Sequence, residues 1–223
     1  MDWQALNVSL LLAALTALIL TPIGILVARK LAWSQFPGRN FAQALIALPL
    51  ILPPTVLGFY LMISLGELSF IGRLYEDVAG ESLVFSFEGI LLASVIFNIP
   101  FAVQPVQRSF EAIPHNIREA AWCSGLSGWQ TFWKIEVPLA WPGIVSAAIL
   151  TIAHTLGEFG VVLMVGGNLA GETRTVAIAI YDRVQAFDNA GAATMSAALL
   201  MISLLSITLI YFLTDRAAVN VRR

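Results

Sequence analysis

Two ionisable side chains, His154 and Glu158, lie within an otherwise apolar segment, residues 139–165. In a helix, their spacing of four residues places both on one face, where they could pair or relay a proton. The neighbouring glycines Gly157 and Gly160 permit close helix approach, which favours a structural hydrogen-bonding role for Glu158. Because two ligands without a third do not form a metal site, no metal is expected here.

Composition places the chain in a membrane. Hydrophobic residues make up 58% and charged residues 12%, far from the usual balance of soluble domains. The one cysteine, Cys123, excludes an internal disulfide and a multi-thiolate metal cluster. A net charge of −2 gives no sign of a nucleic-acid binder. We therefore expect an all-α polytopic membrane protein without bound cofactor or metal.

Five long segments without charged residues can each cross a bilayer, since about 20 apolar residues suffice. The first lacks the basic start and the cleavage site of a signal peptide, so we expect it to stay as a membrane anchor. The sequence predicts one membrane domain over residues 1–223, with a polar loop at 108–138. The predicted transmembrane helices cover residues 6–28, 41–66, 88–107, 139–165 and 190–213.

The basic residues divide unequally between the two sides of this arrangement, nine against three. By the positive-inside rule the richer side is cytoplasmic, which predicts an external N-terminus, a cytoplasmic C-terminus and a cytoplasmic loop 108–138. The nine are Arg29, Lys30, Arg39, Arg108, Arg118, Lys134, Arg216, Arg222 and Arg223, and the three are Arg73, Arg174 and Arg183.

The loop 108–138 is predicted to form two short helices. Asn116 followed by Glu119 predicts an N-cap with a reciprocal carboxylate, opening a helix over residues 117–124 that Gly125 ends. Ser127 with Gln130 predicts a second capped start. This second helix is expected to present three aromatic residues to the membrane interface, namely Trp129, Phe132 and Trp133. Two prolines, Pro138 and Pro142, are expected to separate it from the fourth span.

The loop resembles the EAA loop of ABC importer permeases: Glu-Ala-Ala, three residues, Gly, nine residues, Ile, one residue, Leu-Pro, with Val137 in place of Leu. We call residues 108–138 the EAA loop. The resemblance implies a type I permease fold, a homodimer, two copies of a separate ATPase that uses ATP and Mg, and an extracytoplasmic binding protein. The chain itself contains no P-loop motif and is not expected to be an enzyme. The implied coupling residues are Glu119, Ala120, Ala121, Gly125, Ile135 and Pro138.

Further segments resemble the molybdate branch of these permeases, so oxyanion import across the inner membrane is implied, with sulfate or tungstate as alternatives. His154 departs from that branch, where Arg is expected. The matching segments are Phe36-Pro37-Gly38, residues 48–54, Leu156-Gly157-Glu158-Phe159-Gly160 and Gly171-Glu172-Thr173-Arg174-Thr175. A secondary transporter that uses Glu158 and His154 as a proton relay is the rival from another class.

A dianion can cross only along a wet or donor-lined path. Prolines can free such donors by interrupting helices, and we predict interruptions at Pro49, Pro53 and Pro54 in the second span and at Pro100 and Pro105 in the third. Simple packing kinks are the alternative. Thr55 is expected to border the path or its gate, with Gly157 and Glu158 as further candidates.

At the external mouth we expect an amphipathic helix over residues 174–187, with Val176, Ile180, Val184 and Phe187 on one face. Thr173 is the predicted cap of this helix. Arg174 either meets the oxyanion or its binding protein, or pairs with Glu172.

Overall fold

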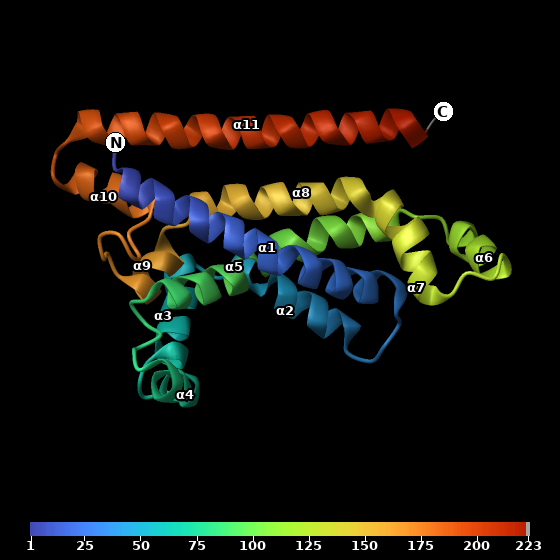
Figure 1. Ribbon diagram of the computed structural model, residues 1–223, viewed down its shortest axis with the longest axis horizontal. Coiled ribbons are helices and arrows are strands. Elements are labelled where there is room, and N and C mark those ends of the chain that lie inside the picture. The colour runs from blue at the N-terminus through green and yellow to red at the C-terminus, as the bar shows by residue number, and fades with distance from the viewer. Residues whose placement is uncertain (222–223) are drawn as a thin grey trace.

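A computed structural model describes residues 1–221, and Figure 1 shows them as a bundle of long helices with shorter helices at both ends. The ends of the traced chain lie at opposite ends of the bundle (Figure 1). Within these residues there is no strand. Arg222 and Arg223, counted above, lie outside the described residues. The long helices are α1 (Trp3–Trp33), α5 (Phe87–Glu111), α8 (Val137–Leu156) and α11 (Asn189–Val221).

Four helical segments are long and apolar enough to cross a membrane: Trp3–Trp33, Phe87–Glu111, Gly128–Leu156 and Asn189–Phe212. A fifth is obtained if α2 (Arg39–Ile51) and α3 (Pro54–Leu65) count as one span, bent by 110°. The break lies at Pro53, as the prolines predict, whereas Pro49 stays inside α2. The all-α membrane class is thus clear, with four or five spans in the described residues.

Helix α5 is the centre of the bundle and packs against α1, α8, α2 and α9 (Gly160–Gly166). Close approach to α1 depends on Gly24, because a Cβ there would lie 2.9 Å from the Ala102 carbonyl oxygen. The predicted interruption at Pro100 and Pro105 is wrong, since both lie inside the continuous α5. Neighbouring helices cover both sides of α5 and hold it together across the missing backbone hydrogen bonds.

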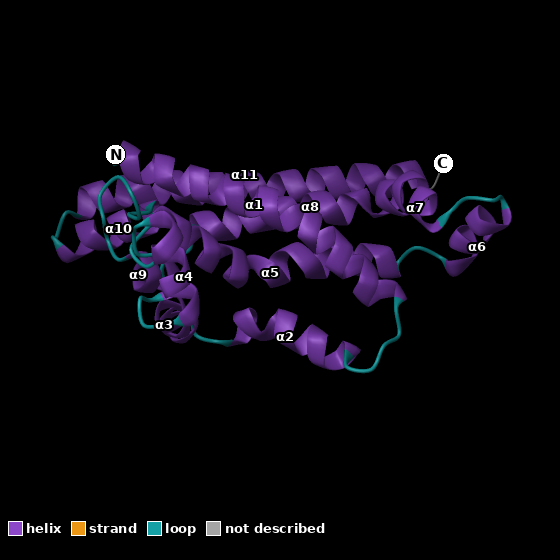
Figure 2. Cartoon of the chain, turned by 60° about the horizontal axis from the view of Figure 1, so that its bottom comes forward, coloured by secondary structure: helices purple, strands orange, loops and turns teal. Residues whose placement is uncertain are grey.

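The short helices gather at the two ends, as Figures 1 and 2 show. At one end lie α9, α10 (Val176–Gln185) and α4 (Phe70–Ala79). No sequence pattern predicted α4. At the other lie α6 (His115–Cys123), α7 (Gly128–Thr131) and a π-helical turn, η1 (Phe132–Glu136). The predicted helix over 139–165 is broken, because α8 ends at Leu156 and α9 begins only at Gly160.

Candidate functional site

The first helix of the EAA loop, α6, ends in a turn that glycine adopts without strain. Gly125 has a φ of +82°, and the Leu126 N–H donates to the Ala121 carbonyl at 3.1 Å. The Gly125 N–H donates to the Trp122 carbonyl at 2.9 Å, which completes a Schellman motif. A Cβ on Gly125 would meet no atom within 4 Å, so the requirement is conformational rather than steric. The predicted helix end is confirmed.

The start of α6 differs from the prediction. Pro114 occupies the N-cap position with an extended ψ of 137°, and no side chain caps the helix. Asn116 therefore lies inside the first turn, and its predicted capping exchange with Glu119 is wrong. The fixed φ of Pro114 explains this, because proline is pre-organised to begin a helix. Glu119 is exposed, and its side chain has no hydrogen-bond partner in the described part of the chain.

The motif residues come from three elements that pack together. Glu119 and Ala120 are exposed on α6, whereas Ala121 is buried against the rest of the loop. Ile135 lies half-buried in η1, and Pro138 lies exposed in the first turn of α8. Since η1 contacts both α6 and α8, the motif forms one unit at the end of the bundle.

The second capped start is confirmed. The Ser127 N–H donates to Gln130 Oε1 at 2.9 Å, and the Gln130 N–H donates to Ser127 Oγ at 3.3 Å. The predicted aromatic face is only partly right. Trp129 and Trp133 are exposed, but Phe132 is 1% exposed and lies in the core cluster. The π-helical turn that starts at Phe132 changes the direction of the following side chains, which a pattern based on regular α-helix cannot anticipate.

Behind α6 lies a fully buried carboxylate held by two arginines. Glu136, 0% exposed, accepts from Arg29 Nε at 2.6 Å and from Arg118 Nε at 2.8 Å. The Arg118 guanidinium also lies over the rings of Trp33 and Trp122, at 4.0 and 4.9 Å from their centroids. Together, Arg29, Arg118 and Glu136 form what we call the buried triad, which joins α1, α6 and η1.

In the membrane-spanning part, the two helix breaks meet. A Cβ on Gly160, at the start of α9, would lie 2.9 Å from Pro54 Cβ at the start of α3. Beside this contact is a cavity of about 500 Å³. Its lining includes four of the predicted path residues, and neither Pro53 nor Pro100 belongs to it. The lining residues are Pro54, Thr55, Phe97, Ala153, His154, Gly157, Glu158, Phe159 and Gly160.

Thr55 brings the polar groups of the α3 start to this cavity. The N–H groups of Val56 and Leu57 both donate to the Pro53 carbonyl, at 2.9 and 3.1 Å. Proline has no N–H, so neither Pro53 nor Pro54 contributes a donor. In this turn, the Thr55 N–H is the main-chain donor without an acceptor among residues 1–221. Its hydroxyl adds a second donor at the cavity wall.

Glu158 is buried beside the same cavity, but its partners are neutral. Its Oε2 accepts from Ser94 Oγ at 2.9 Å and from Asn98 Nδ2 at 3.4 Å, and its Oε1 has no partner among the described residues. His154 does not pair with Glu158, because α8 ends before Glu158. Instead the His154 ring contacts Asn98 Oδ1 at 3.0 Å and stacks on Phe101. The contacts fit the expected hydrogen-bonding role.

In the segment predicted to form the external mouth, two predictions are wrong. The buried Thr173 does not cap α10; its hydroxyl donates to the Gly166 carbonyl at 2.6 Å and accepts from the Leu169 N–H, closing the loop after α9. Arg174 donates to Asn168 at 2.6 Å and lies 3.7 Å from Asp182, rather than pairing with Glu172.

The apolar face predicted for residues 174–187 is also only partly right. In α10 the buried residues are Val176, Ile178 and Ala179, whereas Val184 and Phe187 are exposed. The helix begins only at Val176 and ends at Gln185, so Phe187 lies beyond it with a φ of +58°. The predicted helix was therefore too long. Because Phe187 lies beyond the end of α10, it cannot share a helix face with Val176, Ile180 and Val184.

The sequence matches, over residues 20–222, the family described as binding-protein-dependent transport system inner membrane component. The chain belongs to this family. It is therefore a multi-pass permease of the inner membrane, as its composition and the EAA loop predicted.

Relatives of this permease are named for molybdenum transport or for sulfate transport. It is 43% identical to the molybdenum transport system permease protein ModB of Azotobacter vinelandii, over 94% of this chain and 93% of that protein. It is 33% identical to a probable sulfate transport system permease protein cysT of Chlorella vulgaris, over 89% and 74% respectively.

The fold of the permease is also found in solved ABC transporters. A crystal structure of a bacterial ABC transporter involved in the import of the acidic polysaccharide alginate matches with a TM-score of 0.72. The match covers 96% of this chain and 78% of that one at 15% identity, so it shows the fold alone.

The buried triad of this permease was not predicted from its sequence. Glu136 occupies the unspecified position of the motif between Ile135 and Val137, and one of its partners, Arg29, lies 107 residues away. The one available signal was a carboxylate directly before an apolar span, since burial of such a group requires a cationic partner. That signal does not say which arginine supplies the pairing.

Proposed function

We propose that this permease is the membrane-spanning subunit of an ATP-driven importer of a tetrahedral oxyanion, with molybdate as its substrate. The observation that supports this most strongly is the 43% identity, over nearly the whole chain, to a permease named for molybdenum transport. Sulfate is the second candidate, because a permease named for sulfate transport is 33% identical. Tungstate, sulfate and molybdate share a tetrahedral shape, so the binding protein that delivers the anion makes most of the choice.

The proposed assembly is a homodimer with two ATPase subunits and an extracytoplasmic binding protein. The four or five spans found in residues 1–221 enclose a pore poorly alone, and two-fold symmetry is the usual solution. ATP and Mg would bind to the ATPase, because this sequence has no P-loop. In this arrangement α2 and α3 form the second of five spans, the N-terminus is external and the EAA loop faces the ATPase, in agreement with the unequal distribution of basic residues.

The proposed path for the anion passes the meeting point of the two helix breaks. Transfer of a bare charge into apolar surroundings is very costly, so donors must replace lost water. The Thr55 N–H and hydroxyl are such donors on the wall of a cavity of about 500 Å³. Pro53, Pro54 and Gly157 produce the breaks that expose them. Glu158 supports the shape of this region through Ser94 and Asn98 rather than by binding the anion.

The proposed coupling route starts on the exposed side of α6, at Glu119 and Ala120. From there the buried triad carries displacement of α6 to α1 and to the base of α8, because Arg118 and Arg29 share one carboxylate. Gly125, Ile135 and Pro138 keep the short helices in position. At the opposite end, Thr173 shapes the external mouth, and Arg174 remains 31% exposed for contact with the binding protein.

The decisive experiment is transport by the permease reconstituted in lipid vesicles with its ATPase and binding protein. We expect ATP-dependent uptake of molybdate that excess tungstate reduces strongly and sulfate weakly. Uptake that continues without ATP and collapses with a proton uncoupler would instead establish the secondary transporter. Preferential sulfate uptake would move the substrate assignment to the second candidate.

A further inference from the structure

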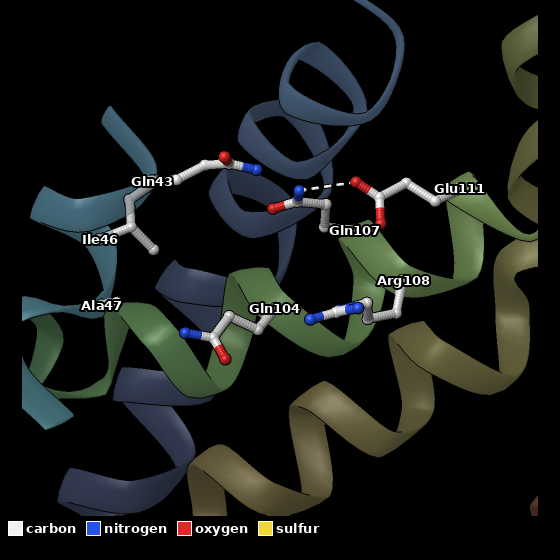
Figure 3. Close-up of a pocket in the computed structure, with 7 residues that line it drawn as sticks. All are labelled: Gln43, Ile46, Ala47, Gln104, Gln107, Arg108 and Glu111. Carbon is white, nitrogen blue, oxygen red and sulfur yellow. Dashed lines mark hydrogen bonds between the residues drawn. The ribbon is translucent and has the colours of Figure 1, made fainter. Parts of the chain in front are cut away.

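A second polar pocket lies between α2 and α5, at the end of α5 that leads into the EAA loop. Its volume is about 350 Å³. Figure 3 shows side chains from both helices around it: Gln43, Ile46, Ala47, Gln104, Gln107, Arg108 and Glu111. Three glutamines and an arginine in adjoining helices are unusual in a chain with only 12% charged residues, and no role described above uses them.

The charges in this pocket do not cancel. Glu111 accepts from Gln107 Nε2 at 2.8 Å and lies 3.5 Å from the Arg39 guanidinium at the start of α2. The Arg108 side chain has no hydrogen-bond or ion-pair partner anywhere in the described chain, and Figure 3 shows it extending away from Glu111 towards Gln104. With Glu111 compensated by Arg39, one positive charge remains.

The other polar groups of the pocket include two amides that make no hydrogen bond within residues 1–221. The side chains of Gln43 and Gln104 also have no hydrogen-bond partner within residues 1–221, and both line the pocket. An amide NH₂ and a guanidinium are donors whose geometry suits oxygen atoms of an anion. A volume of about 350 Å³ exceeds ten times the roughly 30 Å³ that a water molecule occupies. The pocket can therefore hold a small anion together with part of its hydration shell.

We propose that this pocket binds the tetrahedral oxyanion after it has passed the helix breaks, as a low-affinity site on the release side of the permease. The inference rests on the proposed function for the identity of the anion. One charged donor and two neutral amides, in a partly exposed pocket beside a carboxylate, give weak binding. Weak binding suits release, because a tight site at this point would retain the anion.

The test measures binding of molybdate to the purified permease–ATPase complex in lipid nanodiscs, without binding protein or ATP. Titration calorimetry of the wild type should give saturable binding, with sulfate and tungstate competing and chloride not competing. Arg108→Gln should weaken binding about tenfold or more, because it removes the charge-assisted donor. Arg73→Gln is the matched control, since Arg73 lies on α4 and contacts only backbone carbonyls of its own turn.

A second variant is expected to act in the opposite direction. Glu111→Gln removes the carboxylate and frees Arg39, so binding should become several-fold tighter, which misfolding would not produce. If the wild type does not bind molybdate, or if the wild type and Arg108→Gln bind it equally, the proposal that this pocket binds the anion is wrong. If the same complex, reconstituted into lipid vesicles with ATP and the binding protein, still imports molybdate, the proposed function stands without the pocket. If it imports none of the three oxyanions, the proposed function fails independently.

Discussion

Two buried carboxylates, at two regions of the permease, have opposite surroundings. Glu136, within the EAA loop, meets two guanidinium groups, whereas Glu158, beside the helix breaks, meets a hydroxyl and an amide. A buried charge is tolerated only when an opposite charge accompanies it. Glu136 therefore belongs to an ionic connection between helices, and Glu158 to a neutral hydrogen-bond network that holds a break in shape.

The largest effect should come from removing the ionic carboxylate. Glu136→Ala leaves Arg29 and Arg118 facing each other without compensation, and we expect a loss of about 3 kcal/mol in stability and little transport. The measurement is thermal unfolding of the purified complex together with its level in the membrane. Replacing all three members of the triad by Met should recover stability while transport stays low. A stable and active Glu136→Ala protein would show that the ionic surroundings of Glu136 do not distinguish its role from that of Glu158.

At the same end of the molecule, Gly125→Val should distort the turn that ends α6. A β-branched residue at a φ of +82° costs about 1–3 kcal/mol. We expect ATP hydrolysis to continue while uptake per ATP falls, measured on one reconstituted preparation. Gly128→Val is the control, because Gly128 lies nearby, does not have a positive φ, and would have no atom within 4 Å of an added Cβ. Equal effects of the two substitutions would contradict the conformational argument.

At the helix breaks, Thr55→Leu should lower uptake about tenfold, because a hydrogen-bond donor is lost and the cavity is partly filled. Assembly with the ATPase and the stability of the complex should not change. Val56→Leu, one residue further along the same exposed turn, adds similar bulk without removing a donor and should transport normally. Normal molybdate uptake by Thr55→Leu would exclude Thr55 from the path.

Glu119→Gln distinguishes the role of the exposed Glu119 carboxylate from that of the buried Glu136 carboxylate. Since Glu119 caps nothing in α6, the substitution should leave unfolding temperature unchanged. Its effect should appear only in coupling, as reduced uptake with an intact complex in pull-down with the ATPase. A stability loss comparable to that of Glu136→Ala would show that the two carboxylates share one role.

The smallest effect is expected for Glu158→Gln. Ser94 and Asn98 can donate to an amide oxygen as well as to a carboxylate, so stability should change by less than about 1 kcal/mol. Glu158→Leu leaves the Ser94 hydroxyl without an acceptor, whereas Asn98 Nδ2 keeps its bond to the Ser94 carbonyl, and it should cost about 1–3 kcal/mol. Transport should persist in Glu158→Gln; complete loss of uptake with normal stability would favour the proton relay.

Local sequence patterns predicted the features that depend on neighbouring residues. Gly125 and the pair Ser127 and Gln130 occupy their expected positions because a cap is decided within a few residues. The break at Pro53 follows equally from local chemistry. The predicted cap at Asn116 was wrong because the start of a helix is also decided locally, and Pro114 takes the N-cap position two residues earlier.

Contacts between distant segments were beyond prediction. The break after Leu156 contains no proline, and glycines such as Gly157 are common in unbroken membrane helices. Its position depends on packing against Pro54, which sequence spacing does not reveal. The burial of Phe132 and Glu136 likewise depends on α1, so their roles became visible only in three dimensions.

The π-helical turn η1 gives the nine-residue spacing between Gly125 and Ile135 a mechanical meaning. Its wide turn is closed by the Val137 N–H bonding to the Phe132 carbonyl, five residues back, so it contains one residue more than an α-turn would. Deleting one residue here would restore a regular helix, whereas a further insertion or deletion that the turn cannot absorb would rotate α7 by about 100° per residue against α8. The number of residues between Gly125 and Ile135 therefore sets the orientation of α7 relative to α8. We expect insertions and deletions in this interval to be less tolerated than most substitutions.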